Sequence, residues 1–221
     1  DLWARDYTVN AMAIPLRGDL DALLDPTGGR ADLAARRLRA ASASAFEDDP
    51  ARILRGVRQR ATLGFDLASE TEALARAWVG ALARVSAERI RDEIWLILAE
   101  PRAAASLAYA ADLGVWRVLL PELTPGGALE QALATLDALE ADFGGWAVGG
   151  NVVDESDDPN GLARFRADLR AHWAEELSFG RARWQALKWM AFIGACSVVA
   201  VEEIAQRLRL SVREVEFIGR V

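Results

Sequence analysis

The chain has 221 residues, 52% of them hydrophobic, a net charge of −7 and one cysteine. This is enough apolar material for one large domain or two small ones, and a single cysteine excludes a disulfide framework within the chain. The acidic balance argues against a broad nucleic-acid-binding surface, although residues 1–65 hold 10 arginines against 9 acidic residues and are slightly basic.

The first part of the chain predicts a small α+β region. Residues 7–16 and 21–25 favour strands joined by a turn at Arg17-Gly18-Asp19, and residues 37–41 favour a third strand. Gly28-Gly29 breaks the chain before a short helix at residues 32–36. Arg5, Asp6 and Asn10 place a cation, a carboxylate and an amide on or beside the first strand.

A helix is predicted over residues 49–65. Asp49 is a good N-cap, and Pro50 fits the first helical position, where no N–H is needed. Apolar residues occupy one face of this helix, and Arg52, Arg55 and Arg58 occupy the other. Guanidinium groups suit phosphate oxygens and the edge of a base, but a solvated arginine face with a carboxylate that only caps the helix is the alternative.

The rest of the chain predicts helices. We expect them at residues 70–83, 86–99, 102–113, 128–142, 162–178, 182–195, 200–209 and 211–220, with a loop or linker at 144–161. Ser211 and Glu214 have the spacing of a capping box. Trp95, Trp116, Trp189, Ile193 and Leu208 are predicted core residues. The most apolar stretch, residues 190–201, is too short to span a bilayer, so we expect no membrane partner. The single cysteine, Cys196, suits a reducing compartment, so we expect a cytoplasmic protein.

Several ordered segments of the first 123 residues resemble motifs of one enzyme family, the class II tRNA nucleotidyltransferases and poly(A) polymerases, which include the CCA-adding enzymes. The family's ribose-contacting strand corresponds to residues 4–11, its hinge segment to residues 25–33, and its base-reading helix to residues 48–58 followed by Leu63-Gly64-Phe65. A later family stretch, V-S-x-E-R-I-x-x-E, corresponds to residues 85–93, and residues 114–123 resemble a helix that ends in P-E-L.

This resemblance implies the fold class and the division of the chain. It implies a mainly α protein with an N-terminal α+β remnant of a nucleotidyltransferase head, followed by a helical neck, body and tail. The expected parts are residues 1–41 for the head remnant, 42–143 for the neck and body with the nucleotide-recognition helix, 144–161 for the linker, and 162–221 for the tail.

The resemblance also implies the function and its site. Asp49 and Arg52 would pair with the base edges of CTP and ATP, and Arg5, Arg55 and Arg58 would contact ribose and triphosphate. Asp6 and Asn10 complete the implied nucleotide-binding set. The implied partner is the 3′ end of tRNA, the implied cofactor of the full-length enzyme is Mg²⁺, and a homodimer is compatible with the sequence.

The sequence departs from the family at the catalytic metal site. The family's Gly-rich loop and metal-binding Asp-x-Asp pair lie on strands before the ribose motif, so we expect this chain to be the C-terminal part of the enzyme, with no catalytic or metal-binding residue of its own. Asp19-Leu20-Asp21 has the spacing but is expected in a turn. The alternative is a non-catalytic helical module that binds RNA, nucleotide or a protein.

The tail carries a second, shorter resemblance. Residues 187–195 are similar to a stretch that begins a metal-dependent phosphohydrolase site in some relatives, where His and Asp occupy the positions of Gly194 and Ala195. We therefore expect a degenerate scaffold without a hydrolase metal site, and a generic core helix is the alternative reading of this segment.

Overall fold

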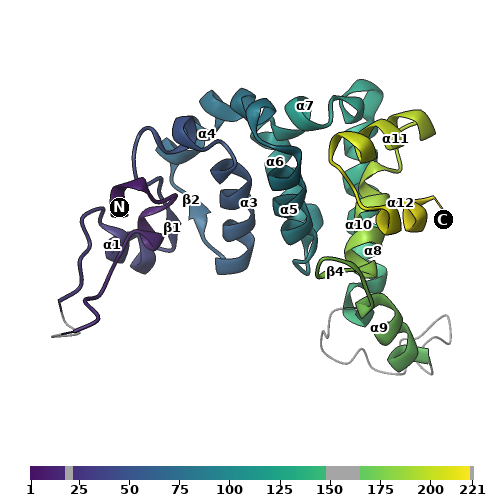
Figure 1. The fold of residues 1–221 in the computed structure, drawn as a ribbon, viewed down its shortest axis with the longest axis horizontal. Coiled ribbons are helices and arrows are strands. Elements are labelled where there is room, and N and C mark those ends of the chain that lie inside the picture. The colour runs from purple at the N-terminus through teal and green to yellow at the C-terminus, as the bar shows by residue number, and fades with distance from the viewer. Residues whose placement is uncertain (18–21, 148–164, 220–221) are drawn as a thin grey trace. The chain divides into compact units, whose positions relative to one another are not determined.

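The computed structural model describes residues 1–17, 22–147 and 165–219. These residues are mostly helical and form two compact units (Figure 1). Unit 1 consists of Asp1–Glu93 and Tyr109–Leu119, and unit 2 consists of Ile94–Ala108 and Leu120–Val221. Among the described residues, no helix is both long enough and apolar enough to cross a membrane.

Unit 1 combines short helices with one two-stranded sheet. Strands β1 (Arg37–Leu38) and β2 (Asp66–Leu67) pair in parallel. The helical elements are η1 (Leu2–Ala4), η2 (Thr8–Asn10), α1 (Gly29–Ala34), α2 (Ala45–Asp48), α3 (Arg52–Leu63), α4 (Ser69–Trp78), η3 (Val79–Arg84), α7 (Val115–Leu119), the start of α5 (Ala87–Leu98) and the end of α6 (Ala103–Asp112).

The two strands predicted at residues 7–16 and 21–25 are wrong as continuous strands. Only isolated antiparallel bridges form, between Tyr7 and Ala40 and between Ala13 and Leu24. Residues 8–10 coil into η2 instead, because the Thr8 hydroxyl donates to Asp32 at 2.8 Å and side-chain bonds compete with a strand ladder. The predicted third strand is confirmed at residues 37–38, and Gly18 and Asp19 of the predicted turn lie outside the described residues.

The predicted arginine helix is confirmed, with a later start. Helix α3 begins at Arg52, and residues 50–51 form a turn before it. Asp49 still caps this turn, because its Oδ1 accepts the backbone N–H of Ala51 at 3.2 Å. Gly64 ends the helix at a φ of 64°, a left-handed conformation that favours glycine.

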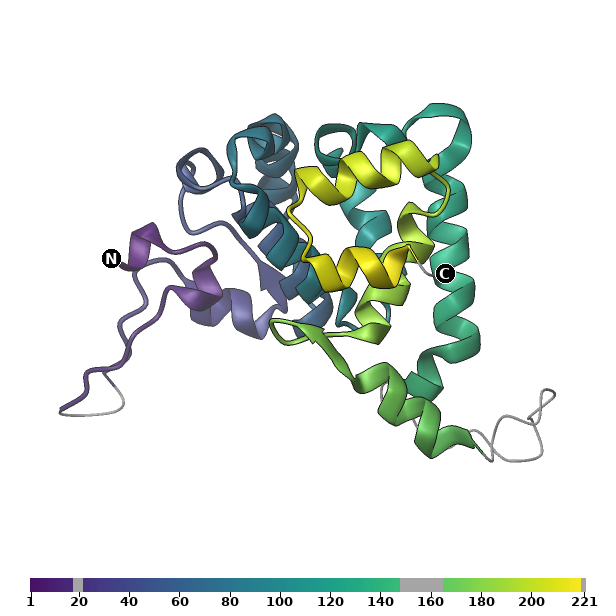
Figure 2. The ribbon, with the colours of Figure 1, turned by 45° about the vertical axis from the view of Figure 1, so that its right-hand side comes forward.

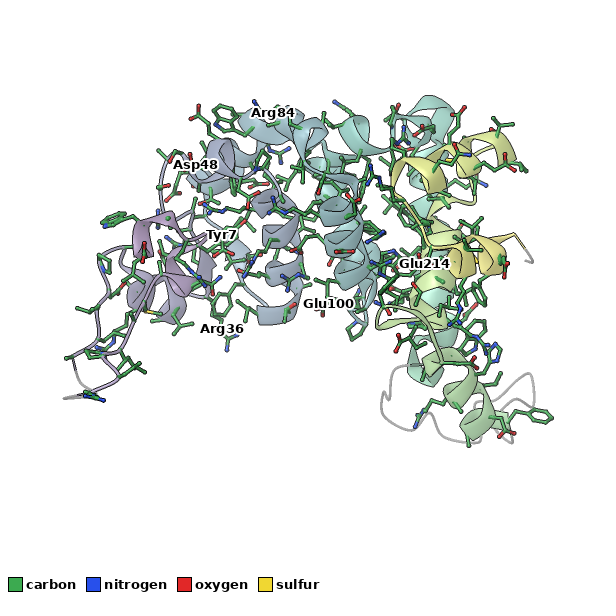
Figure 3. All side chains as sticks on the ribbon, in the orientation of Figure 1. Tyr7, Arg36, Asp48, Arg84, Glu100 and Glu214 are labelled. Atoms are coloured by element: carbon green, nitrogen blue, oxygen red, sulfur yellow. The ribbon has the colours of Figure 1, made fainter. Side chains whose placement is uncertain are left out.

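Tyr7 fixes the N-terminal segment against α3. Its ring is fully buried beside Phe46, and its hydroxyl donates to the carbonyl oxygen of Arg52 at 2.8 Å (Figure 3). Burial raises the pKa of this phenol well above its usual value, with a smaller contribution from Asp6. A Cβ atom on Gly56 would lie 2.0 Å from the Tyr7 hydroxyl oxygen, so only glycine leaves room for this contact.

Unit 2 is built around two helices that run side by side, α8 (Ala128–Ala147) and α10 (Arg183–Ile193) (Figure 2). Helix α9 (Arg166–Ala174) packs on both, and α12 (Val212–Ile218) packs on α10. The other elements are the end of α5, the start of α6, η4 (Pro121–Leu123), η5 (Pro125–Gly127), the hairpin strands β3 (Glu176–Ser178) and β4 (Arg181–Ala182), and α11 (Val198–Arg207).

Two boundaries in unit 2 differ from the prediction. The expected linker begins at Gly144, but α8 continues to Ala147 in spite of the low helix propensity of the Gly144-Gly145 pair. Residues 148–161 of that linker lie outside the described residues. The predicted helix at 162–178 ends at Ala174, and a hairpin follows in which Phe179 and Gly180 both have positive φ.

The predicted core of the tail is confirmed. Trp189, Ile193 and Leu208 are all buried, as are Trp95 and Trp116 elsewhere in the chain. The capping box is also confirmed, since the Ser211 hydroxyl accepts the N–H of Glu214 and Glu214 accepts that of Ser211. Glu214 is fully buried and pairs with Arg181 at 2.9 Å, which joins the hairpin to α12 (Figure 3).

Lys188 is the one lysine of the chain and has no exposed surface. Its Nζ lies 2.7 Å from Glu140 Oε1 and donates to the carbonyl oxygen of Glu100 at 2.6 Å. The Glu140 carboxylate also accepts the backbone N–H groups of Ala103 and Ala104 at the start of α6. Burial lowers the pKa of Lys188, and the bond with Glu140 opposes that shift.

The interlock between Tyr7 and Gly56 generates the first prediction. Gly56→Ala should destabilise unit 1 by about 1–3 kcal/mol, because the new methyl group overlaps the Tyr7 hydroxyl. In a Tyr7→Phe background part of this penalty should disappear, because the oxygen at 2.0 Å is gone while the ring carbon Cζ stays 2.9 Å from the new methyl group. Denaturant midpoints of the four proteins of this cycle provide the measurement. Gly80→Ala is the control, since its Cβ meets open space. Equal penalties in both backgrounds would show that Tyr7 does not set the requirement for glycine.

The Lys188 cluster generates the second prediction. Lys188→Arg should cost about 1–3 kcal/mol although the charge is kept, because a planar guanidinium does not fit a closed space shaped for an ammonium group. Urea unfolding of the variant would measure this cost, and Arg117→Lys at an exposed position serves as the control. A Lys188→Arg variant as stable as the parent would contradict the packing argument.

Candidate functional site

A polar cavity of about 200 Å³ lies in unit 1, between the N-terminal segment, the start of α3 and α5. Ala4 and Ala51 contribute to its wall. The other lining residues are all charged, four arginines against three carboxylates: Arg5, Asp6, Asp49, Arg52, Arg55, Arg89 and Glu93. A cavity of this kind suits a ligand that carries both anionic groups and hydrogen-bonding edges.

Asp49 is held from two sides. Both of its carboxylate oxygens accept from Arg89, at 3.0 and 2.8 Å, and Arg52 Nε lies 3.8 Å from Oδ2. The hydrogen bond to Asp49 raises the pKa of Arg89. Asp49 therefore has a fixed orientation just before α3, and its carboxylate is already hydrogen-bonded to the planar guanidinium of Arg89.

Arg52 points from the first turn of α3 towards the N-terminal segment. Its Nη2 donates to the carbonyl oxygen of Ala4 at 2.7 Å, and its Nη1 donates to those of Arg5 and Ala45 at 3.2 and 3.3 Å. The side chain is 18% exposed. The guanidinium is thus positioned by three backbone carbonyl groups, and its ion pair with Asp49, at 3.8 Å, is longer than a hydrogen bond.

Asp6 lies at the floor of the cavity and is 5% exposed. Its Oδ2 lies 2.6 Å from Arg55 Nε in an ion pair, although the N–H is not aligned as a hydrogen bond. Its Oδ1 accepts the N–H of Tyr7 at 2.9 Å and the amide of Asn10 at 3.1 Å. The Arg55 side chain is 43% exposed, so part of the guanidinium faces the cavity.

Two of the predicted residues lie beside the cavity rather than in its lining. Arg58 Nε donates to Glu93 Oε2 at 2.9 Å, and Asn10 accepts a bond from Arg5 Nε through its backbone oxygen at 3.2 Å. The alternative of a fully solvated arginine face does not hold, because Arg52, Arg55 and Arg58 are all half-buried and paired. The structure therefore gathers Arg5, Asp6, Asp49, Arg52 and Arg55 in one cavity.

Arg89 and Glu93 also line the cavity, although the sequence analysis did not assign them to the site. Both lie on α5, about one turn apart. Arg89 contacts Asp49 and Glu93 contacts Arg58, two residues that the sequence analysis did assign. The signal was present in the stretch of residues 85–93, whose Arg and Glu spacing places both side chains on one helix face. Gln59, which is buried against Asp6 and Asn10, had no such signal.

A metal site is not formed by the described part of the chain. No group of three or more His, Cys, Asp or Glu residues within it could hold a metal ion. Asp19 and Asp21, which have the spacing of a metal-binding pair, lie outside the described residues. Gly194 and Ala195 follow the last residue of α10, and Gly194 lines an apolar cavity of about 410 Å³ together with Met190 and Cys196.

Two family models match the chain. Residues 1–39 match the poly(A) polymerase head domain, and residues 64–126 match the model described as "Probable RNA and SrmB-binding site of polymerase A". The match of the first model to only 39 residues agrees with the small α+β region seen at the start of unit 1.

Curated relatives and a solved structure agree with these models. The CC-adding tRNA nucleotidyltransferase of Geobacter sulfurreducens is 43% identical over 136 residues, which cover 59% of this chain and 31% of the relative. The multifunctional CCA protein of Pseudomonas aeruginosa is 34% identical over 229 residues, covering 100% of this chain and 52% of the relative. A CCA-adding enzyme in complex with CTP shares 25% identity at a TM-score of 0.70, over 100% of this chain and 46% of that chain.

The chain thus spans between about a third and a half of the length of the proteins that it matches. Its motifs, its fold and these likenesses agree, and the chain belongs to the tRNA nucleotidyltransferase and poly(A) polymerase family.

Proposed function

We propose that this chain is the nucleotide-selecting and tRNA-binding part of an enzyme that adds CCA, or part of it, to the 3′ end of tRNA. The observation that carries this proposal is the single cavity that gathers Arg5, Asp6, Asp49, Arg52 and Arg55. The names of the relatives, a CC-adding enzyme and a multifunctional CCA protein, support the reaction class. Because the chain spans only part of these relatives, the activity belongs to the full-length protein.

Asp49 and Arg52 are proposed to read the base. Cytosine and adenine both carry an exocyclic amino group, which donates, next to a ring nitrogen, which accepts. A carboxylate can accept from the amino group while a guanidinium donates to the ring nitrogen. Guanine and uracil present a carbonyl oxygen where the amino group would be, and a carboxylate repels it. The pair at the mouth of α3 therefore favours CTP and ATP over GTP and UTP.

Arg5, Arg55 and Arg58 are proposed to contact the ribose and the triphosphate, with Asp6 and Asn10 completing the nucleotide-binding set. Arg55 presents its exposed guanidinium edge beside the cavity, where phosphate oxygens would find a planar donor. Arg58 is held by Glu93, so its contribution requires that this ion pair opens or that it acts through Glu93.

The remaining partners follow from the proposed reaction. Mg²⁺ is proposed for the full-length enzyme, and its ligands would have to come from residues other than the described ones, which form no metal cluster. The tRNA 3′ end is the proposed acceptor, and the cytoplasm is the proposed location. A homodimer stays a prediction, as does the division of the chain at residues 41, 143 and 161.

The second candidate is a non-catalytic helical module that keeps this fold and binds RNA, nucleotide or a protein. It is supported by the same absence of a metal cluster among the described residues. The two candidates differ in the coding sequence upstream of Asp1, where the enzyme requires a Gly-rich loop followed by an Asp-x-Asp pair.

The base-reading role generates a prediction for Arg52→Ala in the full-length protein. The preference for CTP and ATP over GTP and UTP should fall on the order of tenfold or more, because one base-edge bond to a charged group contributes about 1.5–3 kcal/mol. Incorporation of each nucleotide into a tRNA that lacks its 3′ end would measure the preference.

The control for this experiment is Arg84→Ala, which removes an exposed arginine of unit 1 away from the cavity. Its selectivity should equal that of the parent. An Arg52→Ala protein with the parental selectivity would remove base reading from the proposed roles of this residue.

The residues of this chain alone generate a further prediction. A purified protein of residues 1–221 should incorporate no nucleotide with any divalent metal, because two-metal chemistry needs a carboxylate cluster that the described residues do not form. Incorporation of radiolabelled CTP provides the assay, and the full-length protein provides the positive control. Metal-dependent incorporation by the pure 221-residue chain would contradict this expectation.

A further inference from the structure

The apolar cavity of about 410 Å³ lies between α11 and α12, two helices of unit 2 that a short turn joins (Figure 1). The end of α10 also contributes to it, and we call this space the α11–α12 groove. Its walls are formed by residues of both helices: Val198, Val201, Glu202, Ala205, Val215 and Ile218. The four residues from α11 follow the spacing i, i+3, i+4 and i+7, so they share one face of that helix.

Both walls of the groove are held by contacts on their other sides. On α11, Ile204 is fully buried, and Arg207 Nη2 donates to both carboxylate oxygens of Glu122, at 2.7 and 2.9 Å. On α12, the buried Glu214 pairs with Arg181 of the hairpin at 2.9 Å. None of these residues lines the groove. The groove is therefore preformed, and an occupant would not have to order its walls on binding.

The groove presents apolar surface to water beside one acidic side chain. Val198 is 76% exposed, and Val215 is 44% exposed. Among the described residues that line the groove, Glu202 is the one that carries a charge. It is exposed and has no hydrogen bond or ion pair with any described residue. An apolar surface with an unpaired carboxylate at its edge complements a partner that carries apolar side chains next to a cation.

The charge of unit 2 decides between classes of partner. Its residues include 17 acidic ones against 11 basic ones. This balance repels the phosphates of a nucleic acid and attracts a basic protein segment. A second copy of this chain is disfavoured as well, because a two-fold contact centred on the groove would bring two Glu202 carboxylates together. Apolar grooves of this kind bind amphipathic helices, whose apolar residues recur at i, i+3 or i+4, and i+7.

We propose that the α11–α12 groove binds a basic amphipathic helix of a partner protein. Apolar side chains of this helix lie between α11 and α12, and one of its lysines or arginines pairs with Glu202. The inference goes beyond the proposed function and does not depend on it, since the groove shares no lining residue with the charged cavity of unit 1.

The test uses the full-length protein and two labelled model peptides. Each is an Ala-rich helix of about 15 residues with leucines at the spacing i, i+4 and i+7, flanked by lysines in one peptide and by glutamates in the other. In fluorescence anisotropy the parent should bind the lysine peptide on the order of tenfold more tightly, and Glu202→Arg should reverse this preference. Glu203→Arg makes the same change at the next position of α11, which does not line the groove, and should keep the parental preference.

A second pair of variants tests the apolar walls. Val198→Ser should weaken binding of the lysine peptide on the order of tenfold, because an apolar contact inside the groove is lost. Val199→Ser is the matched control, since Val199 is also exposed but does not line the groove, and it should bind as the parent does. Thermal melting of each variant reports folding independently, and the exposure of both positions predicts unchanged midpoints.

Three results would overturn the inference. The first is a parent protein that binds neither peptide at concentrations up to about 1 mM. The second is a Glu202→Arg variant that still prefers the lysine peptide, or equal losses in the Val198 and Val199 variants, because either would place the contact outside the groove. The third is a Val198→Ser variant that loses tRNA binding as much as peptide binding, because the groove would then belong to an RNA-binding surface.

Discussion

The buried carboxylate of Asp6 couples the N-terminal segment to α3, because its two oxygens receive bonds or charge from Tyr7, Asn10, Arg55 and Gln59. Burying a carboxylate costs free energy unless its oxygens have hydrogen-bond or ion-pair partners, so each of these contacts lowers the cost of burying Asp6. Tyr7 extends the same junction, since its hydroxyl reaches the Arg52 carbonyl through the space that Gly56 leaves open. The positions of Arg52 and Arg55 relative to the N-terminal segment depend on this junction.

The sequence predicted the parts of this protein that local patterns encode. The arginine face of α3 and the capping box at Ser211 follow from spacing and capping chemistry, and both are present. The buried positions of Trp189, Ile193 and Leu208 follow from apolar periodicity. These features depend on residues within one or two turns of each other, and a linear reading recovers such features well.

The misjudged parts depend on contacts between distant residues. The strand predicted at residues 7–16 gives way to a 3-10 turn because Thr8 bonds Asp32, which lies 24 positions later. Helix α8, which packs on α9 and α10, continues through a glycine pair that local helix propensity marks as a break. Arg89 reaches Asp49 across 40 positions, and its spacing from Glu93 was the one local sign of this contact. Gln59 reaches Asp6 across 53 positions, and no local spacing marks that contact.

Selectivity in this cavity follows from the way its charges are already satisfied. Asp49 is bound by Arg89, Asp6 pairs with Arg55, and Glu93 is bound by Arg58 from beside the cavity, so each carboxylate of the cavity wall already has a guanidinium partner. An anion that entered would exchange partners with groups that are already bonded, and the net gain of each exchange is small. A ligand that reproduces every displaced bond loses nothing, whereas one that leaves a single buried carboxylate or guanidinium unpaired incurs the full desolvation cost. Under the proposed function, this arrangement therefore favours discrimination between similar nucleotides over strong attraction for any polyphosphate.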